Sequence, residues 1–120
     1  MTKSKVINLK QKDFLKKKII NKKFKNKTGI IMFGVEWCGY CHQTKPVLEE
    51  LSKISKHFIV GYLDCDKEPL IAGNLNISGY PTLMNVKKNG LLTEYNGPRD
   101  LTSLVGLLCK NLNNKNKICK

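Results

Sequence analysis

Apolar and polar positions alternate along this chain in a way that predicts several strands and helices. The run at 29–35 is continuously apolar and of strand length, which is typical of a central strand buried on both faces. Further on, the apolar positions within 47–54 recur at the three- and four-residue spacing of an amphipathic helix. We therefore expect a helix over 38–56, kinked where Pro46 interrupts its backbone hydrogen bonds.

The remaining segments extend this alternation. The sequence Asn89-Gly90 is the strongest hairpin signal in the chain. The expected strands are 5–9, 58–63, 82–87 and 91–95; the expected helices are 11–25 and 100–112, with a short helix or loop before residue 76. The order βαβαβαββα predicts an α/β fold with a central mixed sheet flanked by helices.

The helix predicted over 11–25 depends on apolar residues scattered among lysines. Leu15 and Ile19 are four residues apart, so a helix would place them on one face.

Length and composition indicate one globular domain. The chain has 120 residues, of which 41% are hydrophobic and 26% charged, and these proportions exclude a wholly disordered chain. We expect a single domain over 1–112, which includes the basic segment 1–27, and a polar C-terminal tail over 113–120.

Positive charge is concentrated at the N-terminus. The formal net charge is +13, and residues 1–27 carry eleven lysines and a single acidic residue. Such a segment is attracted to acidic partners. Because it has no arginine and its only aromatic residues are Phe14 and Phe24, we do not expect specific nucleic-acid recognition. Arg99 is the one arginine in the chain.

The sequence shows no secretory or membrane-spanning segment, so we expect a cytoplasmic location. In that reducing compartment structural disulfides are rare. The chain has five cysteines, an odd number. Outside the motif described next, we expect Cys65 and Cys109 to be small core residues and Cys119 to be an exposed thiol.

The sequence Trp37-Cys38-Gly39-Tyr40-Cys41 is the main candidate for chemistry. It follows a predicted buried strand and opens a predicted helix, where free N–H groups stabilise a thiolate on Cys38. Cys41, one turn further on, can displace a substrate from a mixed disulfide with Cys38. A zinc site needs two more ligands at close spacing, and His42 is too near Cys41 to serve, so we expect no metal.

Three linked motifs carry a family resemblance. The segment 36–41, then Pro46, and then Gly79-Tyr80-Pro81-Thr82 are similar to the thioredoxin family. The segment 94–99 resembles the catalytic domains of protein disulfide isomerases within it. The resemblance implies the thioredoxin fold and a thiol–disulfide oxidoreductase acting on protein disulfides. It implies no cofactor other than the redox-active Cys38–Cys41 disulfide.

The resemblance also implies roles for residues around the cysteines. In the family, the proline that matches Pro81 is cis and faces the active-site cysteines, so Tyr80 would flank the substrate groove. Trp37 would offer an apolar contact to extended substrates, beside Gly39 and Tyr40. Family members with proline at the Tyr40 position are reducing and those with histidine are oxidising. Tyrosine leaves the direction of electron flow open.

Two positions depart from the family pattern, and a third position matches it. The buried acid that assists proton transfer at the second cysteine is replaced by Met32. The lysine that faces this acid in disulfide isomerases is replaced by Tyr62. Arg99 matches an arginine that favours the thiolate of the second cysteine, so we place it with Cys38 and Cys41 as a catalytic candidate.

Two functional hypotheses remain. The first is an oxidoreductase that works with an upstream reductase or oxidase. The second is a binding module whose basic N-terminal third docks on an acidic partner, with a secondary role for the cysteines. Large cytoplasmic DNA viruses run disulfide-forming relays with thioredoxin-like proteins. A viral source would reconcile isomerase-like motifs with a cytoplasmic location.

Overall fold

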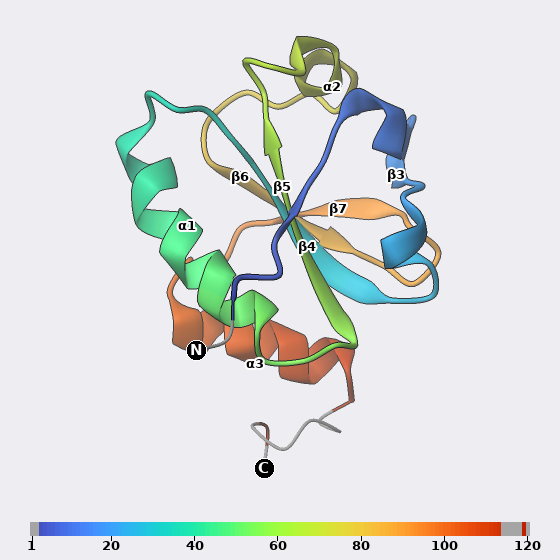
Figure 1. The fold of residues 1–120 in the computed structure, drawn as a ribbon, viewed down its shortest axis with the longest axis vertical. Helices are drawn as coiled ribbons and strands as arrows, with labels where there is room; N and C mark the ends of the chain where they lie inside the picture. The colour runs from blue at the N-terminus through green and yellow to red at the C-terminus, as the bar shows by residue number, and fades with distance from the viewer. Residues whose placement is uncertain (1–2, 114–118, 120) are drawn as a thin grey trace.

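A five-stranded mixed sheet forms the centre of the molecule (Figure 1). The computed structural model describes residues 3–113 and residue 119. In spatial order the strands are β1 (Ile7–Asn8), β5 (Phe58–Asp64), β4 (Thr28–Gly34), β6 (Thr82–Val86) and β7 (Leu92–Tyr95). The first three are parallel, whereas β6 runs antiparallel to β4 and β7 antiparallel to β6. The predicted mixed sheet is thus confirmed, and each strand lies within a few residues of its expected position.

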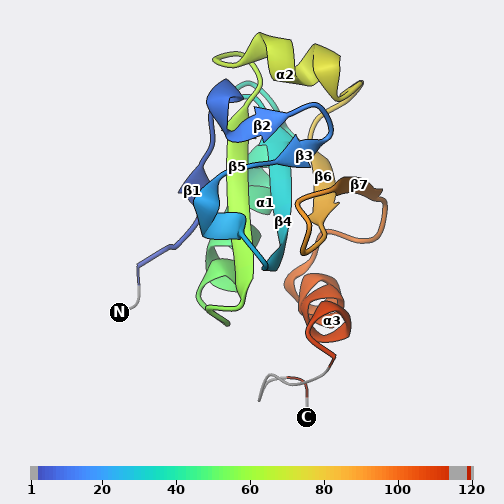
Figure 2. The ribbon, with the colours of Figure 1, turned by 90° about the vertical axis from the view of Figure 1, so that its right-hand side faces the viewer.

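Helices and a small hairpin cover the sheet. The helices are α1 (Gly39–Ser52), α2 (Pro69–Asn74) and α3 (Leu101–Asn111). Figures 1 and 2 show α1 on one face and the hairpin of β2 (Phe14–Leu15) and β3 (Lys18–Ile19) on the other. Helix α3 packs beside α1, and α2 lies near the end of the sheet where α1 begins. The helix predicted over 38–56 is confirmed but ends earlier, at Ser52.

The helix predicted over 11–25 is wrong. That segment forms two short 3-10 turns, η1 (Gln11–Asp13) and η2 (Lys22–Phe24), on either side of the β2–β3 hairpin. Phe14 and Ile19 pair directly across the hairpin and are both buried, whereas Leu15 is 61% exposed. The apolar side chains therefore follow the two-residue alternation of strands rather than the helical repeat.

Backbone contacts fix this hairpin against the turn between β6 and β7. Gly90 has a φ of +89° in that turn, a conformation that suits glycine. The N–H of Ile19 donates to the Gly90 carbonyl at 2.9 Å, and a Cβ at Gly90 would lie 2.6 Å from the Ile19 carbonyl oxygen. A side chain at residue 90 would separate the two segments.

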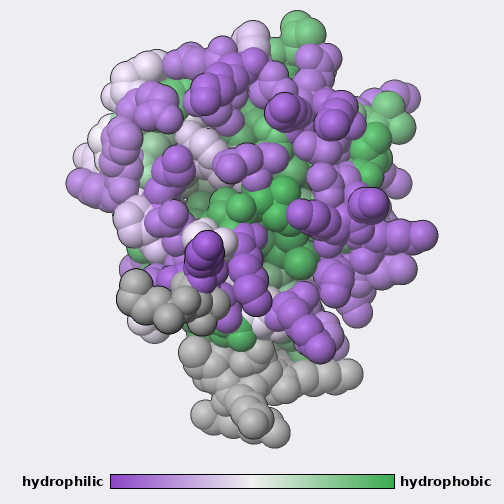
Figure 3. Space-filling model, viewed as in Figure 1, coloured by the Kyte–Doolittle hydropathy of each residue, from purple (hydrophilic) through white to green (hydrophobic). Residues whose placement is uncertain are grey.

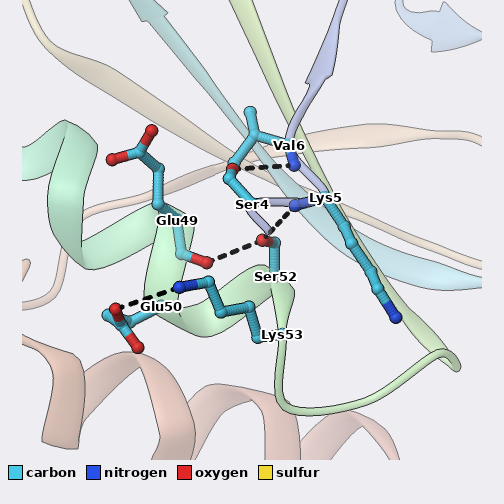
Figure 4. Close-up of polar contacts among 7 residues, drawn as sticks. All are labelled: Ser4, Lys5, Val6, Glu49, Glu50, Ser52 and Lys53. Atoms are coloured by element: carbon cyan, nitrogen blue, oxygen red, sulfur yellow. Dashed lines mark hydrogen bonds and ion pairs between the residues drawn. The ribbon is translucent and has the colours of Figure 1, made fainter. Parts of the chain in front are cut away.

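The N-terminal strand is also attached to α1. Figure 4 shows Ser52 between the two: its hydroxyl accepts the backbone N–H of Lys5 at 2.9 Å and donates to the carbonyl of Glu49 at 2.7 Å. The neighbouring Lys53 pairs with Glu50 on the exposed side of the helix. These bonds hold residues 4–6 alongside the second half of α1.

The C-terminal cysteines differ from the sequence expectation. Cys109 is buried as predicted, but it forms a disulfide with Cys119, so Cys119 is not an exposed free thiol. Their Cα atoms are 5.6 Å apart, within the range of protein disulfides. Both side chains pack at the apolar core, which the sequence spacing did not indicate. Of the predicted tail 113–120, residues 114–118 and 120 lie outside the described residues.

The surface is strongly hydrophilic over the face seen in Figure 3, around a smaller apolar area at its middle. Of the lysines in residues 3–27, all except Lys27 are exposed. Across the described residues, none of the helices has the length and apolar character needed to span a bilayer.

Candidate redox site

The loop that follows β4 places two free thiols at the start of α1. Cys38 is the N-cap residue of the helix, and its Sγ accepts the backbone N–H of Cys41 at 3.1 Å. Strand β4 is buried along its whole length, so its end fixes the position of this loop. The Cys38 side chain is 8% exposed and that of Cys41 only 2%. The two thiols are therefore adjacent, with Cys41 the more deeply placed.

Burial gives Cys41 an unfavourable environment for a thiolate. It raises the pKa of the Cys41 thiol to about 11, and the hydrogen bond with the Cys38 side chain acts in the same direction. A backbone hydrogen bond with Val35 and the positive charge of Arg99 lower that pKa. Loss of the Cys41 proton thus depends on help from neighbouring groups.

Aromatic side chains surround the cysteines on the outside. Trp37 is 71% exposed, contrary to what a core tryptophan would show, and Tyr40 is also exposed. The Trp37 ring lies edge-on to Tyr80, with centroids 5.9 Å apart. Its Nε1–H donates to the Asp66 carboxylate at 2.9 Å. Asp66 was not anticipated, although it follows β5, whose end lies beside the end of β4 in the predicted parallel pairing.

Tyr80 and Pro81 enter the site from the segment before β6. The peptide bond between them is cis, and both residues are half-buried. The Tyr80 hydroxyl faces Cys65, which is buried as expected. Burial raises the pKa of Cys65 to about 11, while the Tyr80 hydroxyl lowers it. Cys65 therefore contacts a predicted substrate-binding residue, a contact that the sequence did not suggest.

Arg99 reaches the site from the loop before α3. Its guanidinium carbon lies 5.7 Å from the centroid of the Tyr40 ring, and the side chain is exposed. A groove of about 350 Å³ lies between Pro81 and Arg99, with Glu94 and Tyr95 among its walls. Arg99 thus stands close to the Cys-x-x-Cys segment even though it is far away in the sequence.

Two neighbouring residues of the sheet beneath the cysteines have uncharged side chains. Met32 is fully buried and pairs in register with Tyr62, which is also buried. Gly34 leaves a gap between the layers: a Cβ there would lie 3.0 Å from Cys41 Sγ and 3.4 Å from the Tyr62 hydroxyl oxygen. The Tyr62 hydroxyl therefore approaches Cys41 from the sheet.

The structure brings all the predicted site residues to one end of the sheet. They are Trp37, Cys38, Gly39, Tyr40, Cys41, Tyr80, Pro81 and Arg99. His42 is exposed, and its Nε2 donates to the Glu36 carbonyl in the loop before the helix. Within the described part of the chain, no three His, Cys, Asp or Glu side chains are grouped to hold a metal ion.

The chain belongs to the thioredoxin family. The family model described as Thioredoxin matches residues 5–110, nearly the whole of the described chain. Among curated proteins, it is 32% identical to a Dictyostelium discoideum protein named as a protein disulfide-isomerase, over 84% of this chain and 25% of that protein. It is 34% identical to protein disulfide isomerase-like 2-2 of Oryza sativa, over 67% of this chain and 23% of that protein. The chain therefore spans about a quarter of the length of these relatives.

Solved structures confirm the fold. The Trx4 domain of ERdj5 has a TM-score of 0.71 and 22% identity, and the match covers 91% of this chain and 96% of that one. Human ERp44 has a TM-score of 0.73 and 24% identity over 92% of this chain and 30% of that one. The thioredoxin fold predicted from the sequence is thus confirmed.

Proposed function

We propose that this chain is a thiol–disulfide oxidoreductase that acts on protein disulfides, with Cys38 as the nucleophile and Cys41 as the resolving cysteine. The observation that carries the proposal is the position of Cys38 Sγ at the N-terminus of α1, where it accepts the Cys41 N–H at 3.1 Å. Free backbone N–H groups and the helix dipole stabilise negative charge at that place. Membership of a family that includes disulfide isomerases supports the same chemistry.

The two cysteines divide the reaction between them. The Cys38 thiolate attacks one sulfur of a substrate disulfide, and the other sulfur leaves as a thiolate. Cys41 then loses its proton and attacks Cys38 Sγ, which breaks the mixed disulfide and releases the second substrate sulfur. The products are a Cys38–Cys41 disulfide and a reduced substrate. The reverse sequence oxidises a substrate dithiol.

The exposed residues beside Cys38 are suited to an extended polypeptide. Trp37 and Tyr40 offer aromatic surface, and Gly39 has no neighbouring atom near the position of a Cβ. Tyr80 and Pro81 border the same site, and an extended chain can align with a backbone edge at such a place. We assign substrate contact to these five residues.

Trapping of the mixed disulfide tests this proposal. Cys41→Ser removes the resolving thiol, so disulfide-linked adducts on Cys38 should accumulate with a disulfide-containing protein substrate. Cys38→Ser, the matched control, should form none. The measurement is non-reducing electrophoresis followed by mass spectrometry of the linked peptide. Equal adduct formation by the two variants would contradict the assigned roles.

The class of partner follows from the same chemistry, which runs in either direction. The chain needs an upstream reductase or oxidase to restore its cysteine pair after each turnover, and the reaction requires no cofactor beyond that pair. The cytoplasmic location stays a prediction. The Cys109–Cys119 disulfide is of a kind more usual in oxidising compartments.

Docking on an acidic partner is the alternative role. The exposed lysines of residues 3–27 support it, because a dense positive surface attracts acidic macromolecules at a distance. Retention on an acidic matrix at increasing salt tests this role: the lysines should give salt-sensitive retention that Cys38→Ser leaves unchanged, although that variant forms no adducts.

A further inference from the structure

We propose that the Tyr62 hydroxyl relays the proton that Cys41 loses in the resolving step, a role that rests on the proposed function. Tyr62 lies on β5, next to β4 and beneath the start of α1. Nothing in the Cys-x-x-Cys segment itself points to it, because the two residues are brought together only by the register of the sheet.

Gly34 leaves the space that lies between Tyr62 and Cys41. The point where a Gly34 Cβ would sit is 3.0 Å from Cys41 Sγ, 3.3 Å from Tyr62 Cε1 and 3.4 Å from the Tyr62 hydroxyl oxygen. The thiol and the hydroxyl thus face the same small gap. No direct hydrogen bond joins them among the described residues, so we assign one bridging water molecule to this gap. Any larger residue at position 34 would occupy this space.

Cys41 needs a neighbouring group that can accept its proton. Its burial holds the pKa of the thiol near 11, so very little thiolate exists at neutral pH. Met32, which pairs with Tyr62 in the sheet, is fully buried and has no group that titrates, so it cannot accept the proton. The hydroxyl of Tyr62 is an oxygen able both to accept and to donate a proton.

A small cavity connects Tyr62 to the outside. It has a volume of about 170 Å³ and lies between the N-terminal segment and α1. Its walls include Ser4, Val6 and Glu49, whose arrangement Figure 4 shows, together with Lys45 and Tyr62. The described residues offer the Tyr62 hydroxyl no hydrogen-bond partner, and Tyr62 lines this cavity, so we assign water in the cavity as its partner.

The step conserves atoms and charge. As Cys41 approaches Cys38, its S–H proton passes through the bridging water to the Tyr62 oxygen, while the Tyr62 proton passes to water in the cavity. The resulting thiolate attacks Cys38 Sγ, a new sulfur–sulfur bond forms, and the substrate sulfur leaves with the bonding electrons. Tyr62 ends the step as it began, as a neutral phenol.

Charged and titratable groups around Tyr62 favour this neutral form. Burial raises its pKa strongly, and Asp64, Cys41, Glu36 and Cys65 act in the same direction. Lys45 is the facing cation, with its Nζ 4.4 Å from the centroid of the Tyr62 ring. A phenol that keeps its proton at neutral pH can accept one proton while it donates another. It cannot act as a general base in the phenolate form.

The second phase of reaction with Ellman's reagent tests the proposal. One thionitrobenzoate is released when Cys38 attacks the reagent, which leaves the other bound to Cys38 as a mixed disulfide. The second is released when Cys41 attacks Cys38. Tyr62→Phe keeps the ring and removes the hydroxyl, so it should slow the second phase about tenfold or more at pH 7. The difference should shrink towards pH 10, where hydroxide deprotonates Cys41 directly.

Thr28→Val is the matched control, because it removes a buried hydroxyl that has no hydrogen-bond partner among the described residues, at the other end of β4. It should leave both phases as in the unmodified chain. An unchanged second phase in Tyr62→Phe, or a slowdown of equal size at every pH, overturns the relay. If the unmodified chain itself releases only the first thionitrobenzoate, the proposed function fails and the relay fails with it.

Discussion

Cys38 and Cys41 are three residues apart and yet occupy different environments. Cys38 accepts a backbone N–H at the start of a helix, whereas burial holds the pKa of Cys41 near 11. The environment of Cys38 stabilises a thiolate, which a nucleophile requires. The environment of Cys41 keeps its thiol protonated until the resolving step. The difference in environment supports a nucleophilic role for Cys38 and a resolving role for Cys41.

Arg99 is predicted to assist Cys41 by its charge. Its positive charge lowers the Cys41 pKa, so Arg99→Ala should raise that pKa further and slow the resolving phase about threefold, a size typical of an exposed charge. Arg99→Lys keeps the positive charge, so it should slow the resolving phase less than Arg99→Ala does. Stopped-flow release of the second thionitrobenzoate provides the measurement.

Lys110→Ala is the control for Arg99→Ala, since it also removes an exposed cation, at the far end of α3. If the two alanine variants react at the same rate, Arg99 has no special part in the resolving step.

Single residues of the site were predictable where a local motif contains them. The Cys-x-x-Cys segment and the Gly79–Thr82 motif identified seven of the eight site residues, and the segment before α3 identified Arg99. Asp66 and the approach of Tyr62 to Cys41 were not predictable in this way. Both arrangements depend on how neighbouring strands align, and the second also depends on the absence of a side chain at Gly34.

At the scale of elements, the N-terminal hairpin is the main departure from the predicted pattern. The continuous apolar run at 29–35 and the Asn89-Gly90 turn are strong local signals, and the structure confirms both. Residues 11–25 carry a weak helical signal, with two apolar pairs among lysines. Contacts with the rest of the molecule, such as the bond from Ile19 to Gly90, decide the structure of such a segment.

Two alanine variants distinguish the hairpin from a helix. Phe14 is buried and its ring lies 6.0 Å from that of Phe33, so Phe14→Ala should lower the free energy of unfolding by about 3 kcal/mol. Leu15 is exposed in the hairpin, so Leu15→Ala should change the free energy of unfolding by less than about 0.5 kcal/mol. Urea denaturation gives both values. A larger loss for Leu15→Ala would indicate the amphipathic helix instead.

At the scale of the whole molecule, the redox site is formed by segments that are distant in the sequence. The ends of β4 and β5, the Tyr80–Pro81 segment and the loop before α3 meet at one end of the sheet. The Cys109–Cys119 disulfide lies towards the other end of α3 from Arg99. Redox chemistry at the first pair can therefore be measured separately from the second.

The redox equilibrium with glutathione shows whether Cys38 and Cys41 act as one disulfide-forming pair. The chain is equilibrated over a series of glutathione ratios, free thiols are alkylated in acid, and each cysteine pair is quantified by peptide mass spectrometry, with Trp37 fluorescence as a second signal. We expect Cys38 and Cys41 to oxidise together in one two-electron transition, with a tenfold change in the ratio of disulfide to dithiol for about every 30 mV. Glutathione held on Cys38 with Cys41 still reduced at every ratio would contradict it.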